Sequence, residues 1–206
     1  MVSIYTLKPA FQRLLLPAVR ALARAGVTAN QVTVAACAVS IALGVALYVL
    51  PAAPRWFALI PAWLLLRMAL NAIDGMLARD FGQRSTLGAY LNELTDVASD
   101  AALYLPFARL PGVDAAWLGA VVVLAALTEL AGVLGQTVGA SRRYDGPLGK
   151  SDRAAVFGAF GLAAALWQPL PGWIGALLPL VAVLTAVTVW TRVRAGLAEA
   201  RAAARI

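Results

Sequence analysis

Long apolar segments separated by short polar breaks dominate the hydropathy pattern of the chain. A helix needs about 20 mostly apolar residues to cross a bilayer. Proline and glycine mark the breaks, as at Pro111 and Gly112. The pattern therefore predicts an all-α integral membrane protein with six transmembrane helices. We expect these spans at residues 31–50, 55–78, 86–108, 114–138, 153–169 and 173–191.

The first 26 residues follow a different pattern. Basic residues such as Arg13 and Arg20 are interspersed with apolar ones such as Leu15 and Val19. There is no compact apolar core followed by a cleavage site, so the segment does not resemble a signal peptide. It predicts an amphipathic helix in the membrane interface, with an ordinary solvated helix as the alternative. We expect a single domain over 1–206, divided into this interfacial helix (1–26), a six-helix core (27–192) and a basic tail (193–206).

Composition supports a membrane protein and narrows the chemistry. The 206 residues are 62% hydrophobic and 13% charged, whereas about 25% of residues in soluble proteins are charged. The chain has no histidine, and its one cysteine, Cys37, lies in an apolar segment. These facts exclude histidine bases, the common zinc sites and an intrachain disulfide framework.

The basic residues set the expected topology. In a six-span arrangement, both termini and the loops 79–86 and 139–152 hold most of the 17 lysines and arginines on one side. The positive-inside rule assigns that side to the cytoplasm. The net charge of +7 thus indicates cytoplasmic loops and lipid headgroups rather than nucleic acid. We expect a multi-pass protein of the bacterial inner membrane, with both termini and the active site in the cytoplasm.

Two of the predicted spans carry polar residues along one helical face. Arg67, Asn71, Asp74 and Ala78 follow an i, i+4, i+7, i+11 pattern in the second span. An ionisable side chain at such depth costs roughly 2.5–3.5 kcal/mol on insertion scales, so intramembrane charges usually serve a function. The alternative is an ion-pair cluster that only locks two helices together.

The third span has a matching polar face. Gly88, Asn92, Asp96 and Asp100 recur every four residues. A short loop joins the two spans, so we expect them to pack as antiparallel neighbours with their polar faces meeting in a cavity. An ion pair between Arg67 and Asp100 is expected within it.

These two spans together resemble the signature of the CDP-alcohol phosphatidyltransferases, Asp-x2-Asp-Gly-x2-Ala-Arg-x8-Gly-x3-Asp-x3-Asp. This chain reads Asn71-x2-Asp74-Gly75-x2-Ala78-Arg79-x8-Gly88-x3-Asn92-x3-Asp96. The spacing is complete and six of the eight identities match. The resemblance implies transfer of a phosphatidyl group from CDP-diacylglycerol to an alcohol with release of CMP, by a homodimer that uses Mg²⁺ or Mn²⁺.

The resemblance also implies a role for each signature position. Asp96 corresponds to the general base. The metal ligands correspond to Asn71, Asp74, Asn92 and Asp96, with Asp100 a candidate replacement and Glu93 a weaker one. The nucleotide is held by Asp74, Gly75, Ala78, Arg79 and Gly88.

The chain departs from the family pattern at Asn71 and Asn92, where the pattern has aspartate. An amide oxygen can ligate a metal but brings no charge. We expect one firmly held ion, or a second ion that binds only with the diphosphate of the CDP-lipid. The same departure leaves two alternatives open, a non-catalytic or weakly active relative that binds nucleotide or lipid, and a small membrane transporter.

A second group of polar residues follows in the fourth and fifth spans. In relatives, basic residues in this region hold the phosphate of the acceptor or of the lipid. From the cluster of basic residues we expect an acceptor with a phosphate or another anionic group, and anionic lipid headgroups are the alternative ligand. Charges that merely set the topology are the alternative. The candidates are Glu129, Gln136, Arg142, Arg143, Lys150 and Arg153.

Overall fold

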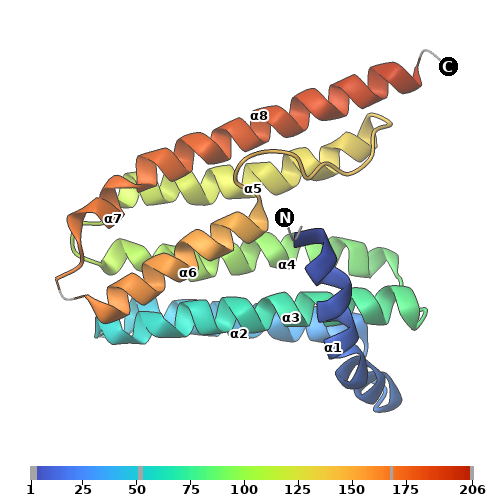
Figure 1. Ribbon diagram of the computed structural model, residues 1–206, viewed down its shortest axis with the longest axis horizontal. Coiled ribbons are helices and arrows are strands. Elements are labelled where there is room, and N and C mark those ends of the chain that lie inside the picture. Colours follow the sequence, from blue (N-terminus) through green and yellow to red (C-terminus); the bar gives the residue numbers. More distant parts are fainter. Residues whose placement is uncertain (1–3, 51–52, 168, 205–206) are drawn as a thin grey trace.

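The computed structural model describes residues 4–50, 53–167 and 169–204, and this part of the chain forms helices and connections without any strand. The prediction of an all-α fold is confirmed. Figure 1 shows the long helices running roughly parallel or antiparallel to one another in a bundle. The elements are α1 (Ile4–Arg24), α2 (Ala29–Val49), η1 (Pro54–Ala58), α3 (Leu59–Asp80), α4 (Thr86–Tyr104), η2 (Leu105–Arg109), α5 (Ala115–Thr137), α6 (Lys150–Leu166), α7 (Gly172–Ala176) and α8 (Leu178–Ala203).

Polar side chains cap α2 and α4, the helices on either side of α3 in the sequence. The Thr28 side chain accepts from the backbone N–H of Gln31, and the Gln31 side chain accepts in return from Thr28. Ser85 accepts from the backbone N–H of Gly88 at 2.9 Å and so starts α4. These caps fix where α2 and α4 begin, and with them the depth of their polar residues.

Four helical segments of the described chain are long and apolar enough to cross a membrane: Ala29–Val49, Pro54–Asp80, Ala115–Thr137 and Gly172–Ala203. The other two predicted spans coincide with helices of a different character. Helix α4 carries Glu93, Asp96 and Asp100, and α6 has only 17 residues, of which Lys150, Asp152 and Arg153 are charged. Polar side chains and a shorter length, rather than a break in the helix, distinguish these two segments.

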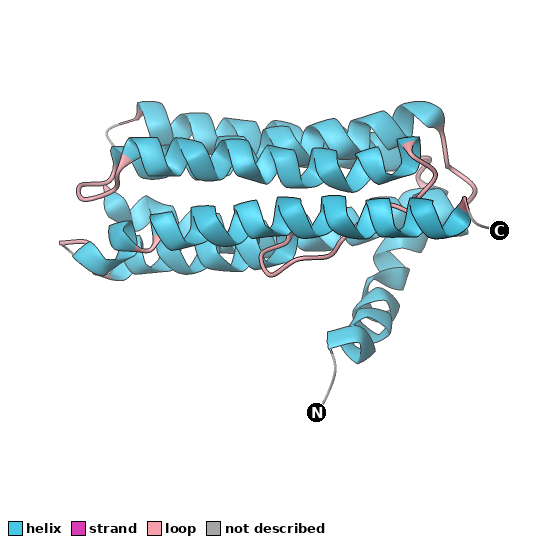
Figure 2. Cartoon of the chain, turned by 90° about the horizontal axis from the view of Figure 1, so that it is seen from above, coloured by secondary structure: helices cyan, strands magenta, loops and turns pink. Residues whose placement is uncertain are grey.

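The apolar core lies between the helices and is richest in aromatic rings at one end of the bundle. The ring of Tyr104 stacks on Phe157 with 3.8 Å between centroids, and Phe57 and Phe107 pack edge to face beside them. A smaller cluster that includes Val19, Ile73 and Leu77 joins α1 to α2 and α3. Figure 2 shows that the rest of α1 projects away from the bundle.

The structure adds detail to two expectations, the neighbourhood of α3 and α4 and the basic tail. Helix α2 packs closely against both α3 and α4, whereas close contacts between α3 and α4 themselves are few. The two polar faces meet as expected, but through side chains, since Arg67 and Asn71 of α3 both reach Asp96 of α4. The expected basic tail after residue 192 is helical to Ala203, as the continuation of α8.

Candidate active site

The polar faces of α3 and α4 are joined by one arginine. Arg67 places Nη1 2.5 Å from Oδ1 of Asp100 and Nη2 3.0 Å from Oδ1 of Asp96, and it also donates to the backbone oxygen of Asp96. The predicted Arg67–Asp100 ion pair is present, and Arg67 is only 4% exposed. One guanidinium therefore fixes both acidic residues on α4, as its planar geometry allows.

Signature residues lie around this arginine. The amide nitrogen of Asn71 donates to Asp96 Oδ1 at 3.3 Å, one turn along α3 from Arg67. Asp74 is buried and accepts a hydrogen bond of 2.8 Å from the hydroxyl of Thr33 on α2. Asn92 instead donates to Glu93 at 3.2 Å. Asn71 and Asp96 are thus in direct contact, whereas Asn92 bonds to a residue outside the signature.

The glycines of the signature lie where polar side chains approach the backbone. A Cβ atom at Gly75 would be 3.0 Å from Nη1 of Arg79, so the Arg79 guanidinium lies directly over Gly75. A Cβ atom at Gly88 would be 2.8 Å from Oδ1 of Asn30 on α2. The absence of a side chain at both positions keeps backbone, amide and guanidinium accessible together.

Two residues on α2 were missed by sequence reasoning. Thr33 bonds Asp74, and Asn30 lies beside Gly88 and donates to Ser85 at 3.4 Å. Neither belongs to the signature, and α2 otherwise reads as an apolar span. The only signal was that both follow the Thr28 cap by less than two helical turns.

The connection between α5 and α6 folds back into the bundle (Figure 1). The backbone N–H of Arg143 donates to the oxygen of Gly132 on α5 at 3.0 Å. Gly146 has a φ of +121° and leaves no room for a Cβ atom, which would be 2.5 Å from Cγ2 of Thr188 on α8. Leu148 then donates to the Thr188 hydroxyl at 2.9 Å. Helix α6 therefore begins within the bundle.

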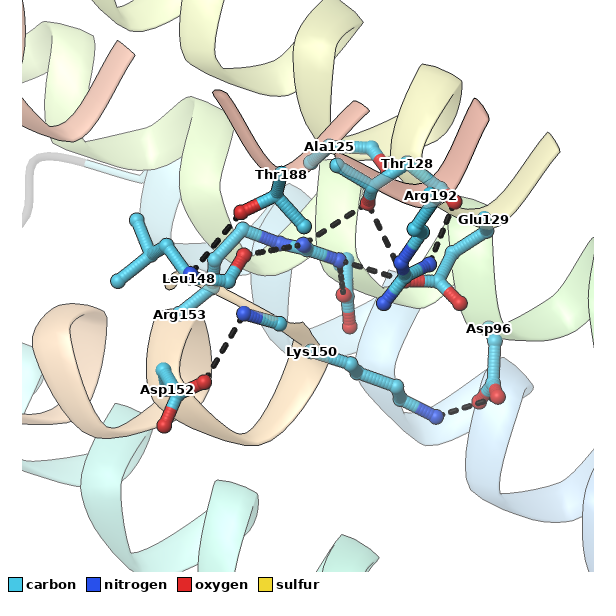
Figure 3. Close-up of polar contacts among 12 residues, drawn as sticks. Asp96, Ala125, Thr128, Glu129, Leu148, Lys150, Asp152, Arg153, Thr188 and Arg192 are labelled. Carbon is cyan, nitrogen blue, oxygen red and sulfur yellow. Dashed lines mark hydrogen bonds and ion pairs between the residues drawn. The ribbon is translucent and has the colours of Figure 1, made fainter. Parts of the chain in front are cut away.

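The position of the first turn of α6 brings two basic residues next to the acidic face of α4. The ammonium group of Lys150 forms an ion pair with Oδ2 of Asp96. Arg153 has no exposed side-chain surface, and it donates to Glu129 at 3.0 Å and to Thr128 at 2.9 Å. Figure 3 shows Arg153 and Arg192 converging on Thr128 and Glu129, while Lys150 reaches toward Asp96.

The remaining basic candidates have acidic partners too. Arg142 pairs with Glu93 and lies 3.6 Å from Glu129. Arg143 pairs with Asp145 at 2.8 Å, and this hydrogen bond lowers the pKa of the Asp145 carboxyl below its usual value. Glu199 accepts from Arg143 and Ser141, which ties the α5–α6 connection to the end of α8.

Gln136 does not join these contacts. It is exposed near the end of α5, whereas Glu129, two turns earlier, is buried. Arg192, which the sequence suggested only as a topology-setting charge, takes the second place beside Glu129 and donates to the Thr128 backbone oxygen at 2.5 Å.

The donor set fits one hard divalent cation. Asp74 and Asp96 would supply carboxylate oxygens and Asn71 and Asn92 amide oxygens, the ligand types that Mg²⁺ and Mn²⁺ prefer. Among the described residues, no group of three or more His, Cys, Asp or Glu is placed to hold an ion. A site with so few carboxylates needs substrate phosphates or water to complete the coordination.

Comparisons with known proteins cover most of the chain. The family model described as CDP-alcohol phosphatidyltransferase matches residues 26–192. The inner membrane protein YnbA of Escherichia coli (strain K12) is 46% identical over 192 residues, which cover 93% of this chain and 95% of YnbA.

Solved structures share the fold at lower identity. The crystal structure of Mycobacterium tuberculosis phosphatidylinositol phosphate synthase (PgsA1) with CDP-DAG bound has a TM-score of 0.75 and 21% identity, over 89% of this chain and 94% of that one. The same enzyme with manganese and citrate has a TM-score of 0.71, over 87% of each chain.

Proposed function

The chain belongs to the CDP-alcohol phosphatidyltransferase family, and on that premise we propose that it transfers a phosphatidyl group from CDP-diacylglycerol to an alcohol and releases CMP. The observation that carries the proposal is the position of Asp96. Its carboxylate faces α3 and is held there by Arg67 and Asn71, while Arg79 lies over Gly75 on the same helix. The structural relationship to an enzyme with bound CDP-DAG supports the choice of donor.

The chemistry assigns one task to each group. Asp96 accepts the proton of the acceptor hydroxyl, whose oxygen forms a new bond to the phosphorus of the phosphatidyl group. The bond from that phosphorus to the bridging oxygen breaks, and CMP leaves. Arg79 and the backbone at Gly75 hold the cytidine diphosphate. A divalent ion held by Asp74 and Asp96, with Asn71 and Asn92 as further ligands, would neutralise charge on the diphosphate.

We assign Asp100 a positioning role beside this site rather than a place among the metal ligands. Its Oδ1 lies 2.5 Å from Arg67, and its Oδ2 lies 3.9 Å from Arg153. A carboxylate between two arginines already has its charge compensated. This favours Asp100 as the anchor that orients Arg67, and through Arg67 the base Asp96.

The proposed setting is the bacterial inner membrane, with six spans, an interfacial α1 and a homodimer. The name of the relative YnbA supports the location. The end of the bundle that holds the α3–α4 connection also holds the C-terminal end of α8 (Figure 1). This end carries Arg79, Arg84, Arg194 and Arg201. The positive-inside rule therefore favours a cytoplasmic site and cytoplasmic termini.

We further propose that the acceptor carries an anionic group, and that Arg142 binds it. The Arg142 side chain is 22% exposed, and its guanidinium lies over the ring of Tyr144. Its buried Nε–H has no hydrogen-bond partner, and an unpaired buried donor favours a ligand acceptor atom. Lys150 pairs with Asp96 instead, and Arg153 lies deeper and is fully enclosed.

A CMP-release assay tests the proposed function. Purified protein is given CDP-diacylglycerol and a panel of alcohols, with Mg²⁺, Mn²⁺ or a chelator. Asp96→Asn and Asp74→Asn are expected to lower the rate by about 10²-fold or more, since general-base catalysis contributes about 10²–10⁴. Asp80→Asn, at an exposed aspartate of the same helix α3, is the matched control and should keep the wild-type rate. Full CMP release by either site variant contradicts the assignment.

A further inference from the structure

Asp96 is surrounded by cations of the protein itself. Its Oδ1 receives Nη2 of Arg67 at 3.0 Å and the amide of Asn71 at 3.3 Å. Its Oδ2 receives the ammonium group of Lys150. Both carboxylate oxygens are thus engaged, so any divalent ion that binds at Oδ2 has to compete with Lys150.

The fold places Lys150 there firmly. It is the first residue of α6, and the preceding Gly149 N–H donates to the Asp152 side chain at 2.9 Å (Figure 3). One turn later Arg153, fully buried, is bound to Thr128, Glu129 and the backbone oxygen of Leu148. The backbone at Lys150 is therefore anchored on both sides, and only its side chain, 27% exposed, extends to Asp96.

The signature of this chain also has less negative charge than the family pattern. Asn71 and Asn92 replace two aspartates, and the Asn71 amide acts as a donor to Asp96, which a carboxylate could not do. Two divalent ions bring four positive charges to two signature carboxylates. One divalent ion and one ammonium group together bring three positive charges. The ammonium group needs only a single acidic partner.

We propose that the ammonium group of Lys150 takes the place of a second divalent cation at Asp96, so that this chain binds one metal ion where the four-aspartate pattern would hold two. The inference rests on the proposed function, because it concerns the metal of the same site. It assigns Lys150 to the diphosphate end of the site, where its charge faces the donor.

Counting bound Mn²⁺ by calorimetry, in detergent and at saturating CDP, tests the inference without turnover. Wild type is expected to bind one ion per chain. Lys150→Met keeps the length of the side chain but removes its charge, and it should bind Mn²⁺ about tenfold more tightly or better because a competing cation is gone. Lys150→Arg, the matched control, should keep the wild-type affinity. Lys150→Gln repeats the test if Lys150→Met does not fold.

A triple variant gives a second test, the number of Mn²⁺ ions bound per chain. Asn71→Asp with Asn92→Asp and Lys150→Met should bind two ions per chain, whereas the two Asn→Asp changes alone should bind one. Two ions in wild type, or an unchanged Mn²⁺ affinity in Lys150→Met, overturns the inference. The inference is also overturned if Lys150→Met raises the KM of the acceptor and leaves the Mn²⁺ affinity unchanged, since Lys150 would then bind the acceptor. A protein that counts one Mn²⁺ but releases no CMP refutes the transferase reaction alone.

Discussion

Arg153 and Glu129 form an ion pair of 3.0 Å inside the bundle, between α6 and α5, and the arginine side chain has no exposed surface. Arg192 approaches the same Glu129 oxygen at 3.5 Å from α8. Three helices that are distant in sequence are thereby joined at one carboxylate. Removing one member of such an enclosed cluster is costly, because a buried charge then loses its nearest partner.

Arg153→Met is therefore expected to destabilise the protein by about 3–5 kcal/mol. Thermal unfolding of purified protein in detergent measures the loss, with Arg201→Met at the exposed end of α8 as the control. Combining Glu129→Gln with Arg153→Met should cost less than the sum of the two single changes, because the Arg153–Glu129 ion pair is lost only once. If the two losses of stability add in full, the ion pair is not the source of the effect.

The helices were more predictable from the sequence than the packing between them. Apolar segments and their breaks gave the six long helices of the bundle within a few residues, apart from α8, which continues past residue 191 to Ala203. The spacing of Arg67 and Asp100 was enough to predict their ion pair. What the pattern could not give was the separation of α3 and α4, since α2 is almost wholly apolar and carries no sign that it packs against both.

Site residues that follow helical spacing could be predicted from the sequence. Those that a loop brings into the site could not. Asn71, Asp74 and Asp96 follow helical spacing, so their common location could be inferred. Lys150 meets Asp96 only because the α5–α6 connection turns back at Gly146 and Leu148. No helical period describes such a turn, and Lys150 was therefore grouped with the basic residues of the loop instead of with Asp96.

Replacing both asparagines of the signature tests their position. Asn71→Asp with Asn92→Asp should strengthen Mn²⁺ binding, since each change adds a carboxylate. Without metal the variant should be less stable than wild type, because a carboxylate at position 71 would face Asp96 where the amide now donates at 3.3 Å. Thermal unfolding with and without Mn²⁺ measures both effects. Weaker Mn²⁺ binding in the variant would show that the asparagines do not face the metal.

Metal and nucleotide are expected to bind cooperatively. The signature supplies only two carboxylates, so the phosphates of CDP have to complete the coordination. Calorimetric titration of Mn²⁺ with and without CDP should give a higher affinity in its presence. The reverse titration should show the same factor, because linkage between two ligands is reciprocal. Equal affinities in the two Mn²⁺ titrations would mean that the ion does not touch the phosphates.

Arg142 offers the clearest test of the acceptor. Its side chain is partly exposed and its Nε–H is unpaired, which favours an anionic group on the alcohol, because a guanidinium can bind phosphate through parallel hydrogen bonds. Arg142→Met should therefore raise the KM of a phosphorylated alcohol about tenfold or more, the cost of roughly one charge-assisted hydrogen bond, and leave the KM of CDP-diacylglycerol nearly unchanged. Arg201→Met serves again as the control for a lost positive charge.

If Arg142 instead binds anionic lipid headgroups, activity should follow the anionic lipid content of the vesicles, at about 1 kcal/mol per basic residue. Efficient use of a neutral alcohol that the Arg142 change does not affect would rule out an anionic acceptor, because no charge would then remain for Arg142 to recognise.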